Sequence, residues 1–458
     1  MKKIIYLMLI LGLVFILNSC DRSTSSSDNK VTFSGVVKLR DLDGSETTSD
    51  EVTIAVFEKE IEDIAWDYRL NTPLVVTSTN EFGEFLYKAQ DNENYYAYFL
   101  MDGYSVKGFQ QKKLTDNIFL FEDFVIGGIV TNHLVLDGTH DLVIHEDVIF
   151  TETGILEIQS ASRIRIYPQK KITVYGTLDF QSPVEITSND RTYSYGVDNI
   201  NLFVSFEIYP SVIIESNSLE NVTCSWSNYG FLVKKDNIHI SNSNFVNSLN
   251  GLYVAESNGV ILNKIFSKKV IGHSNGGIYL EIVDNVQITN CTLLDNYNGI
   301  KVKEVTNLNI NNTLFERNFS GFLSYYSTGL ISHNQFSNNS NSLELLGNRS
   351  SGTLSIEYNN ISVSDIGVYQ HEAGSWNTFH EMIINNNNFE TTDLFIKYDS
   401  SGIHQDLDAT SNYFDGLTDE NSIQDKIMNT STEQELFIDV NVVPFKTRLI
   451  SSAGIIQE

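Results

Sequence analysis

A repeat in the middle of the chain constrains the fold more than any other feature of the sequence. An aliphatic residue is followed five positions later by an apolar or aromatic residue, and this pair recurs every 21 to 28 residues. The pairs are Ile240/Phe245, Ile261/Phe266, Ile288/Leu293, Ile310/Phe315, Ile331/Phe336, Ile356/Ile361 and Ile384/Phe389. The interval is typical of one coil of a solenoid rather than of a propeller blade or a pair of helices.

Each repeat also contains a second short strand, which follows a glycine. Examples are Gly251–Val254, Gly277–Leu280, Gly299–Val302 and Gly367–Tyr369. Apolar and polar residues alternate inside these runs, so each is expected to be a strand with one buried face. Short strands that repeat about every 24 residues, with no helical period between them, predict a parallel β-helix whose coils stack at ~4.8 Å.

The excess of asparagine has a structural explanation in this repeat. A polar residue stands two positions after each repeat isoleucine, at Asn242, Asn263, Asn290, Asn312, His333, Tyr358 and Asn386. Asparagine tolerates the left-handed backbone of a sharp bend, and an inward amide can bond to the coils above and below. We therefore predict a buried asparagine ladder that includes Asn290 and Asn312.

The same stacking bears on the cysteines outside the N-terminal segment. Cys224 and Cys291 should lie three coils apart, ~14 Å along the axis, which is about twice the limit for a disulfide. Both are expected to be buried thiols without a catalytic role.

Three passages resemble the right-handed parallel β-helix repeat proteins of bacterial envelopes, a pectin-lyase-like family. One passage is the set of repeats above. Another comprises Ile166–Pro168, Ile172–Leu178 and Ile186–Ser188, with Gln169 in place of the usual glycine. The third comprises Asn412–Phe414, where Phe414 replaces the usual tryptophan, a short helical run with Ile423 and Ile427, and Val442–Phe445. The resemblance covers about Thr115 to Phe445 and implies the fold but no single function, because the family includes lyases, hydrolases, epimerases and adhesins.

The N-terminus is typical of an exported protein. Lys2 and Lys3 precede an apolar run from Ile4 to Leu17, which fits a signal peptide and is shorter than the ~20 residues that span a bilayer. Leu17–Cys20 resembles the lipobox of bacterial lipoproteins, which implies cleavage before Cys20 and a lipid on its thiol. An ordinary secretory signal is the alternative. We expect a lipid-anchored envelope protein, in the outer membrane or at the cell surface rather than in the inner membrane.

The region between the signal peptide and the repeat has the strand pattern expected of a small antiparallel β-sandwich. Its predicted strands are Val31–Val37, Val52–Phe57, Glu84–Tyr87 and Tyr95–Phe99. Asn80–Phe85 and Asp102–Tyr104 resemble the carboxypeptidase-regulatory-like, transthyretin-like fold. Asp41–Glu46 suggests either a calcium loop or a hairpin turn, and the turn is favoured because later calcium ligands are missing.

The whole chain is therefore expected to be all-β, with a right-handed parallel β-helix after the sandwich. The expected segments are a signal peptide (1–20), a Ser/Thr/Asp-rich tether (21–30), the sandwich (31–113), the β-helix (114–417) and a closing segment (418–458). Lys and Arg number 30 against 58 Asp and Glu, so the formal charge is −28 and nucleic acid is excluded as a partner. We expect a monomer with no cofactor and no metal.

Candidate functional residues lie on the outer side of the strand that follows the glycine. This outer row comprises Tyr253, Tyr279, Glu281, Lys301, Lys303, Leu323, Tyr325, Glu344, Tyr369 and His371. The predicted ligand-binding residues are Tyr253, Tyr279, Glu281, Tyr325 and Tyr369, because tyrosine rings stack on pyranose faces while charges engage hydroxyls. The alternative is a solvated sheet in which tyrosine occurs for its β-propensity.

Two functions follow from this row. The preferred one is an envelope protein whose β-helix binds glycan or protein, without catalysis. The other is a polysaccharide lyase or glycoside hydrolase, with Lys301, Lys303 and His371 as weak catalytic candidates and calcium as a cofactor of this alternative only. Arginine is absent from the row and no close set of aspartates accompanies it, which disfavours catalysis.

Overall fold

The computed structural model describes residues 30–58, 72–90, 95–101, 103–104, 107–111, 118–188, 203–208, 213–214, 218–272, 276–346, 352–371, 382–390, 392–399, 407–429 and 440–456. The protein is all-β, with 61% strand and 2% helix, and the predicted fold class is confirmed. It divides into two compact units, residues 1–122 and 123–458. The signal peptide, Cys20 and nearly all of the tether lie outside the described residues.

The first unit contains two sheets that share one core. The first sheet contains β2 (Glu46–Thr47), β1 (Lys30–Arg40), β5 (Glu84–Gln90) and β8 (Ile118–Phe121). The second sheet contains β4 (Val75–Ser78), β3 (Thr53–Phe57), β6 (Tyr95–Leu100) and β7 (Lys107–Gln111). Phe85 on one sheet and Phe99 on the other pack edge to face, with ring centroids 5.1 Å apart.

Pairing in the first unit is antiparallel except between β1 and β8, which are parallel. Strand β8 falls in the segment that the sequence assigns to the β-helix, and its pairing with β1 joins it to the first unit. Between β1 and β2 the Asp41–Glu46 segment is a hairpin turn, closed by a hydrogen bond from the Asp41 amide to the Ser45 carbonyl (3.0 Å).

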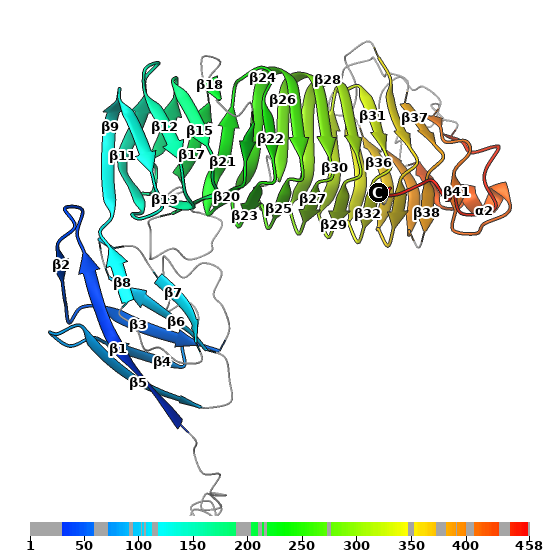
Figure 1. Ribbon diagram of the computed structural model, residues 1–458. Coiled ribbons are helices and arrows are strands. Elements are labelled where there is room, and N and C mark those ends of the chain that lie inside the picture. Colours follow the sequence, from blue (N-terminus) through cyan, green and yellow to red (C-terminus); the bar gives the residue numbers. More distant parts are fainter. Residues whose placement is uncertain are drawn as a thin grey trace, which may run out of the picture. The chain divides into compact units, whose positions relative to one another are not determined.

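The second unit is a solenoid in which each coil visits three parallel sheets in turn (Figure 1). Sheet 1 contains β9 (Phe124–Val130), β11 (Leu142–Phe150), β13 (Ser162–Ile166), β16 (Val184–Ser188), β20 (Val222–Ser225), β23 (Asn244–Val246), β25 (Phe266–Lys268), β27 (Thr292–Leu294), β29 (Leu314–Glu316), β32 (Gln335–Ser337), β35 (Asn360–Ser362), β38 (Asn388–Glu390) and β41 (Tyr413–Phe414).

Sheet 2 contains the second halves of β9 and β11, then β14 (Lys171–Val174), β17 (Phe203–Ile208), β21 (Ser227–Val233), β24 (Asn250–Asn263), β26 (Ile278–Thr289), β28 (Asn298–Asn311), β30 (Ser320–Tyr325), β33 (Asn341–Leu346), β36 (Ile366–His371), β39 (Leu394–Asp399) and β42 (Ile427–Asn429). Sheet 3 has two parts. The first contains β10 (His133–Leu136), β12 (Ile155–Ile158), β15 (Thr177–Phe180) and β18 (Ile213–Ile214). The second contains β19 (Leu219–Glu220), β22 (His239–Ser241), the second halves of β24, β26 and β28, β31 (Gly329–Ser332), β34 (Leu354–Glu357), β37 (Met382–Asn385), β40 (Leu407–Asp408) and β43 (Val440–Asn441).

The repeat pairs form inward columns, as predicted, except in one coil. Phe315 and Phe336 are fully buried on sheet 1, and their rings stack with centroids 4.5 Å apart. Ile261 and Phe266 do not point inward, and Ile261 is 40% exposed. Leu262 and Ser267 take the inward places there, because the strands pair one residue out of step with the sequence pattern. In a strand, a slip of one residue moves every side chain to the other face.

From Asn221 onward, each coil turns from sheet 3 to sheet 1 through one residue in the left-handed region. Asn290 and Asn312 occupy this place, with φ of 55° and 50°. Asn290 is exposed and Asn312 is half-buried, so the prediction that their amides are buried is wrong. At this bend the left-handed residue turns its side chain outward, and the next residue along the chain turns inward.

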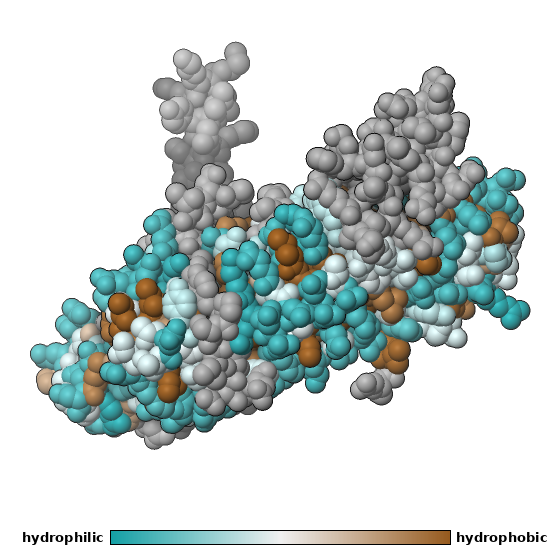
Figure 2. All heavy atoms as spheres, turned by 90° about the horizontal axis from the view of Figure 1, so that it is seen from above, coloured by the Kyte–Doolittle hydropathy of each residue, from teal (hydrophilic) through white to brown (hydrophobic). Residues whose placement is uncertain are grey.

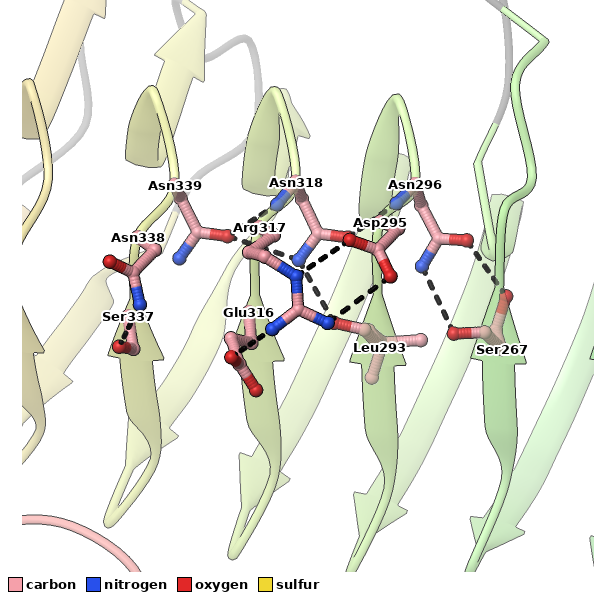
Figure 3. A network of polar contacts seen from close by, with 10 residues as sticks. All are labelled: Ser267, Leu293, Asp295, Asn296, Glu316, Arg317, Asn318, Ser337, Asn338 and Asn339. Atoms are coloured by element: carbon pink, nitrogen blue, oxygen red, sulfur yellow. Dashed lines mark hydrogen bonds and ion pairs between the residues drawn. The ribbon is translucent and has the colours of Figure 1, made fainter. Parts of the chain in front are cut away.

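Two asparagine ladders lie at these inward corner positions. The ladder at the corner between sheets 3 and 1 comprises Asn334, Asn359, Asn387 and Asn412, all fully buried. The ladder at the corner between sheets 1 and 2 comprises Asn296, Asn318 and Asn339 (Figure 3). In the second ladder the Asn318 Oδ1 accepts from the Asn296 amide (3.0 Å), while its Nδ2 donates to the Asn339 Oδ1 (3.0 Å). The ladder prediction therefore holds for the motif, although the residues are different ones.

The C-terminal end of the solenoid core is closed by the helix α2 (Glu420–Gln424), whose Ile423 is fully buried. The chain then runs back along the solenoid, as the position of the C-terminus in Figure 1 shows. The Ile450 amide donates to the Asn388 side chain (2.8 Å), the Gly454 amide to the Tyr358 carbonyl (2.8 Å) and the Ile456 amide to the Asn312 side chain (3.1 Å). We call residues 446–456 the tail.

A buried ion-pair cluster lies on the outer side of sheet 1 in the first coils. Arg165 is 2% exposed; it pairs with Asp123 and, from its Nε, with the Asp141 carboxylate (3.4 Å). Elsewhere hydrophilic residues cover most of the solenoid surface seen in Figure 2, with hydrophobic residues in small separate patches. This distribution follows from the alternation of inward and outward residues along each strand.

Candidate functional site

The predicted outer row lies on sheet 2, where strand pairing resolves it into two parallel rows. The first outer row contains Tyr253, Tyr279, Lys301, Leu323, Glu344, Tyr369 and Lys397 in consecutive coils. The second outer row contains Ala255, Glu281, Lys303, Tyr325, Leu346 and His371. The structure therefore brings all the predicted site residues to one face, although the His371 side chain lies outside the described residues.

The tyrosines of the first outer row stack on one another. The Tyr253 and Tyr279 rings are nearly parallel, with centroids 4.8 Å apart, and Tyr229 packs on the other face of Tyr253 at 5.7 Å. The Lys301 Nζ lies 5.0 Å from the Tyr279 centroid on the side away from Tyr253. Both faces of these two rings are thus covered, and Tyr279 is only 7% exposed. Tyr253 and Tyr279 do not offer ring faces for a sugar, contrary to the expected mode of binding; they present edges and hydroxyls.

Glu281 links the two outer rows through hydrogen bonds. Its carboxylate accepts from the Tyr253 hydroxyl (2.5 Å) and from the Lys303 Nζ (2.6 Å). Burial acts to raise the pKa of Glu281, but the hydrogen bonds from Lys303 and Tyr253 outweigh it and the pKa is lowered. The bond to Glu281 raises the pKa of Lys303. Lys303 is therefore held as a paired ammonium and is poorly suited to remove a proton.

Lys301 has a different environment. Its Nζ lies 5.0 Å from the Tyr279 ring and 5.2 Å from the Tyr325 ring, within the range of cation–π interactions. Burial lowers the pKa of Lys301, and the neighbouring Lys303 adds to this effect, although Glu281 opposes it. Between the two lysine candidates, Lys301 is the one whose surroundings move it toward a base.

The far end of the first outer row contains Glu344, Tyr369 and Lys397. Glu344 accepts hydrogen bonds from the Ser320 hydroxyl and from the Asn341 Nδ2 (3.4 Å). Lys397 lies over the Tyr369 ring at 4.4 Å. Sequence reasoning missed Lys397 because Phe395 replaces the glycine that marks the start of this strand in other coils. It missed Tyr229 because that residue precedes its glycine.

Three further observations bear on the site. Within the described residues, no group of three or more His, Cys, Asp or Glu side chains could hold a metal ion. The described part of the chain also contains no helix long and apolar enough to cross a membrane. Cys224 and Cys291 are buried and form no disulfide, and burial raises the pKa of the Cys291 thiol to about 12.

The coils, the three parallel sheets and the corner ladders define a parallel β-solenoid protein with a polar and aromatic outer face. Comparison with known families agrees: residues 211–354 and 276–432 match the family model described as the right-handed beta helix region. The chain therefore contains a right-handed parallel β-helix repeat. No curated protein and no solved structure matches the chain.

Proposed function

We propose that the protein is a lipid-anchored component of the bacterial envelope and that the outer face of sheet 2 binds glycan. The observation that carries the proposal is the fixed geometry of the Tyr253, Tyr279, Glu281 and Lys303 side chains. Ordering a flexible side chain on binding costs about 0.5–1.5 kcal/mol. Here the stack and the shared carboxylate have already ordered the hydroxyl, carboxylate and ammonium groups that a sugar would meet.

Hydroxyl-rich ligands suit this face better than apolar ones. The tyrosine edges, the Glu281 carboxylate and the Lys303 ammonium together supply both donors and acceptors. Successive outer residues are spaced at ~4.8 Å, so an extended chain of sugars along the rows would meet a new outer residue at each coil. An envelope protein is the other class of ligand, and the proposal prefers glycan because tyrosine and charged residues outnumber aliphatic ones in the rows.

Glycan arrays and calorimetry with the Cys20→Ser chain test the proposal without the lipid. Tyr253→Phe removes the hydroxyl bonded to Glu281 and keeps the stack, and Glu281→Gln removes the carboxylate. Each should weaken glycan binding about tenfold, which corresponds to ~1.4 kcal/mol. Asn309→Ala, an outward residue of sheet 3, is the matched control and should bind as the wild type does. Equal affinities for all four proteins would refute the proposed face.

The envelope location depends on Cys20 and is tested separately. Wild-type protein should partition into detergent and the Cys20→Ser chain should not, because the thiol carries the lipid. Identical partitioning of the two chains would remove the anchor from the proposal. It would not affect the glycan-binding face.

One observation favours the lyase alternative: burial lowers the pKa of the half-buried Lys301. In a lyase this amine would take the proton beside the sugar carboxylate, the glycosidic oxygen would leave, and a carbon–carbon double bond would form. Lys301→Met should then abolish the appearance of unsaturated products, while Lys303→Met should retain it. Absence of unsaturated products from wild-type protein on uronate-containing glycans would exclude this alternative.

A further inference from the structure

The corner between sheets 1 and 2 carries a second column of side chains, next to the asparagine ladder. The column consists of the residues that directly follow the ladder position in successive coils: Leu249, Ile271, Tyr297, Phe319, Ser340 and Asp365. Its register is set by backbone hydrogen bonds from the Phe319 amide to the Asn296 carbonyl (3.1 Å) and from the Ser340 amide to the Asn318 carbonyl (3.1 Å). The ladder in Figure 3 directly precedes three members of this column, Tyr297, Phe319 and Ser340.

The column changes from aromatic to polar residues between Phe319 and Ser340. The Tyr297 and Phe319 rings stack with centroids 4.8 Å apart and planes 15° apart. Phe319 is nevertheless 46% exposed, the highest value for any phenylalanine of the described solenoid residues whose exposure is given. One face of its ring is covered by Tyr297 in the preceding coil. The other face looks toward the following coil, where Ser340 has no ring to cover it.

The size of this step fits one ring of a ligand. Successive coils are ~4.8 Å apart, and carbon atoms of stacked groups pack at ~3.5–4.0 Å. A ring placed on the uncovered face of Phe319 would therefore lie at about the height of Ser340. Asp365 takes the next place in the column and is exposed, so its carboxylate would lie beyond the ring. We call this space beside Phe319 the slot. Phe319 forms its aromatic side, Ser340 its small polar base and Asp365 its acidic side.

The surroundings point to a neutral sugar. Asn341 follows Ser340 at the start of β33, and its Nδ2 donates to the Glu344 carboxylate (3.4 Å). Amide and carboxylate groups suit hydroxyl groups, and the Glu344 and Asp365 carboxylates would repel an anionic ring. Pyranose rings carry an apolar face that stacks on an aromatic ring and a rim of hydroxyls that bonds to such polar groups.

We propose that Phe319, Ser340 and Asp365 form a subsite for one neutral pyranose ring of a glycan chain. The inference rests on the proposed function and deepens it, because Phe319 and Ser340 directly precede β30 and β33, whose outer residues belong to the first outer row. The bound chain would lie along sheet 2 and place one sugar in the slot. This is ring stacking of the kind expected from the sequence, but on a different residue.

The test uses the full chain in detergent and neutral hexose oligosaccharides, with uronate oligosaccharides of equal length as the comparison. Phe319→Ala removes the aromatic wall, and Ser340→Phe fills the slot with a ring that extends the Tyr297–Phe319 stack. Each should weaken binding of the neutral series at least tenfold, and the wild type should prefer the neutral series. Leu249→Ala, two coils before Tyr297 in the same column, is the control and should bind normally. Unchanged urea midpoints for Ser340→Phe will show that the variant is folded.

The outcomes separate this inference from the proposed function. If Tyr253→Phe weakens binding while Phe319→Ala and Ser340→Phe do not, the face stands and the subsite is overturned. If Phe319→Ala and Ser340→Phe weaken binding and Tyr253→Phe does not, the subsite is supported and the proposed binding role of Tyr253 on sheet 2 is refuted. Preference for uronates would also overturn the subsite as a neutral-sugar site. If the wild type binds no oligosaccharide, Phe319→Trp titrated with methyl glucoside decides, because an unchanged indole emission would overturn the subsite as well.

Discussion

Asn318→Leu is the substitution that best tests the physical account of this solenoid. The Asn318 side chain is 3% exposed and makes three hydrogen bonds to neighbouring coils. Its Oδ1 accepts from the Asn296 amide, and its Nδ2 donates to the Leu293 carbonyl and to the Asn339 Oδ1, each at 3.0 Å. Leucine has a similar volume, so the change removes these bonds without opening a large cavity.

The expected loss of stability follows from the groups left without partners. The Asn296 amide loses its acceptor in a buried corner, which costs ~1–3 kcal/mol. The Asn339 Oδ1 still accepts a hydrogen bond from the Asn318 backbone amide (3.0 Å), so losing the bond from the Asn318 side chain costs less free energy there. With about 1 kcal/mol for the two donor bonds of the lost amide, the free energy of unfolding should fall by about 2–4 kcal/mol.

Urea denaturation and amide hydrogen exchange measure this effect. In a solenoid each coil contacts only its neighbours, so exchange should accelerate most in β27, β29 and β32. Tenfold faster exchange corresponds to ~1.4 kcal/mol. Exchange in the first unit should not change, because its core is separate.

Asn290→Leu is the matched control. Asn290 is exposed at the other corner, one coil earlier, and its Nδ2 bonds to Asn263 on the surface (3.0 Å). The free energy of unfolding of the Asn290→Leu variant should differ from that of the wild type by less than about 1 kcal/mol. If the two variants lose equal stability, or if Asn318→Leu melts as the wild type does, the inward ladder is not where the structure places it.

Three further predictions concern other parts of the chain. Arg165→Leu removes the guanidinium that pairs with the buried Asp123 and Asp141 carboxylates and should cost about 3–5 kcal/mol in urea denaturation; a loss below 1 kcal/mol would contradict the burial of this cluster. In the Cys20→Ser chain both remaining thiols should react with a thiol reagent at pH 8 only after denaturant is added, because both are buried and the pKa of Cys291 is raised to about 12. Deletion of the tail removes its bonds to Asn388 and should lower the urea midpoint and speed exchange in β38; unchanged exchange there would show that the tail does not hold these coils.

The sequence by itself determined the fold class and most inward columns. Period-two alternation and an interval near one coil leave few folds open, and Ile288, Ile310 and Phe336 are buried as predicted. The corner residues were also recognisable as asparagine-rich. The outer rows followed from the same alternation, because residues on either side of an inward one must face outward.

The tertiary structure alone decided which asparagines turn inward and how the outer side chains meet. Asn312 and the buried Thr313 are adjacent in sequence, and only the left-handed bend at Asn312 sends one outward and the other inward. The one-residue slip at Ile261 arose from pairing with the coil before it. Stacking between coils joins residues more than twenty positions apart, so the covered faces of Tyr253 and Tyr279 and the uncovered face of Phe319 depend on contacts that no local pattern records.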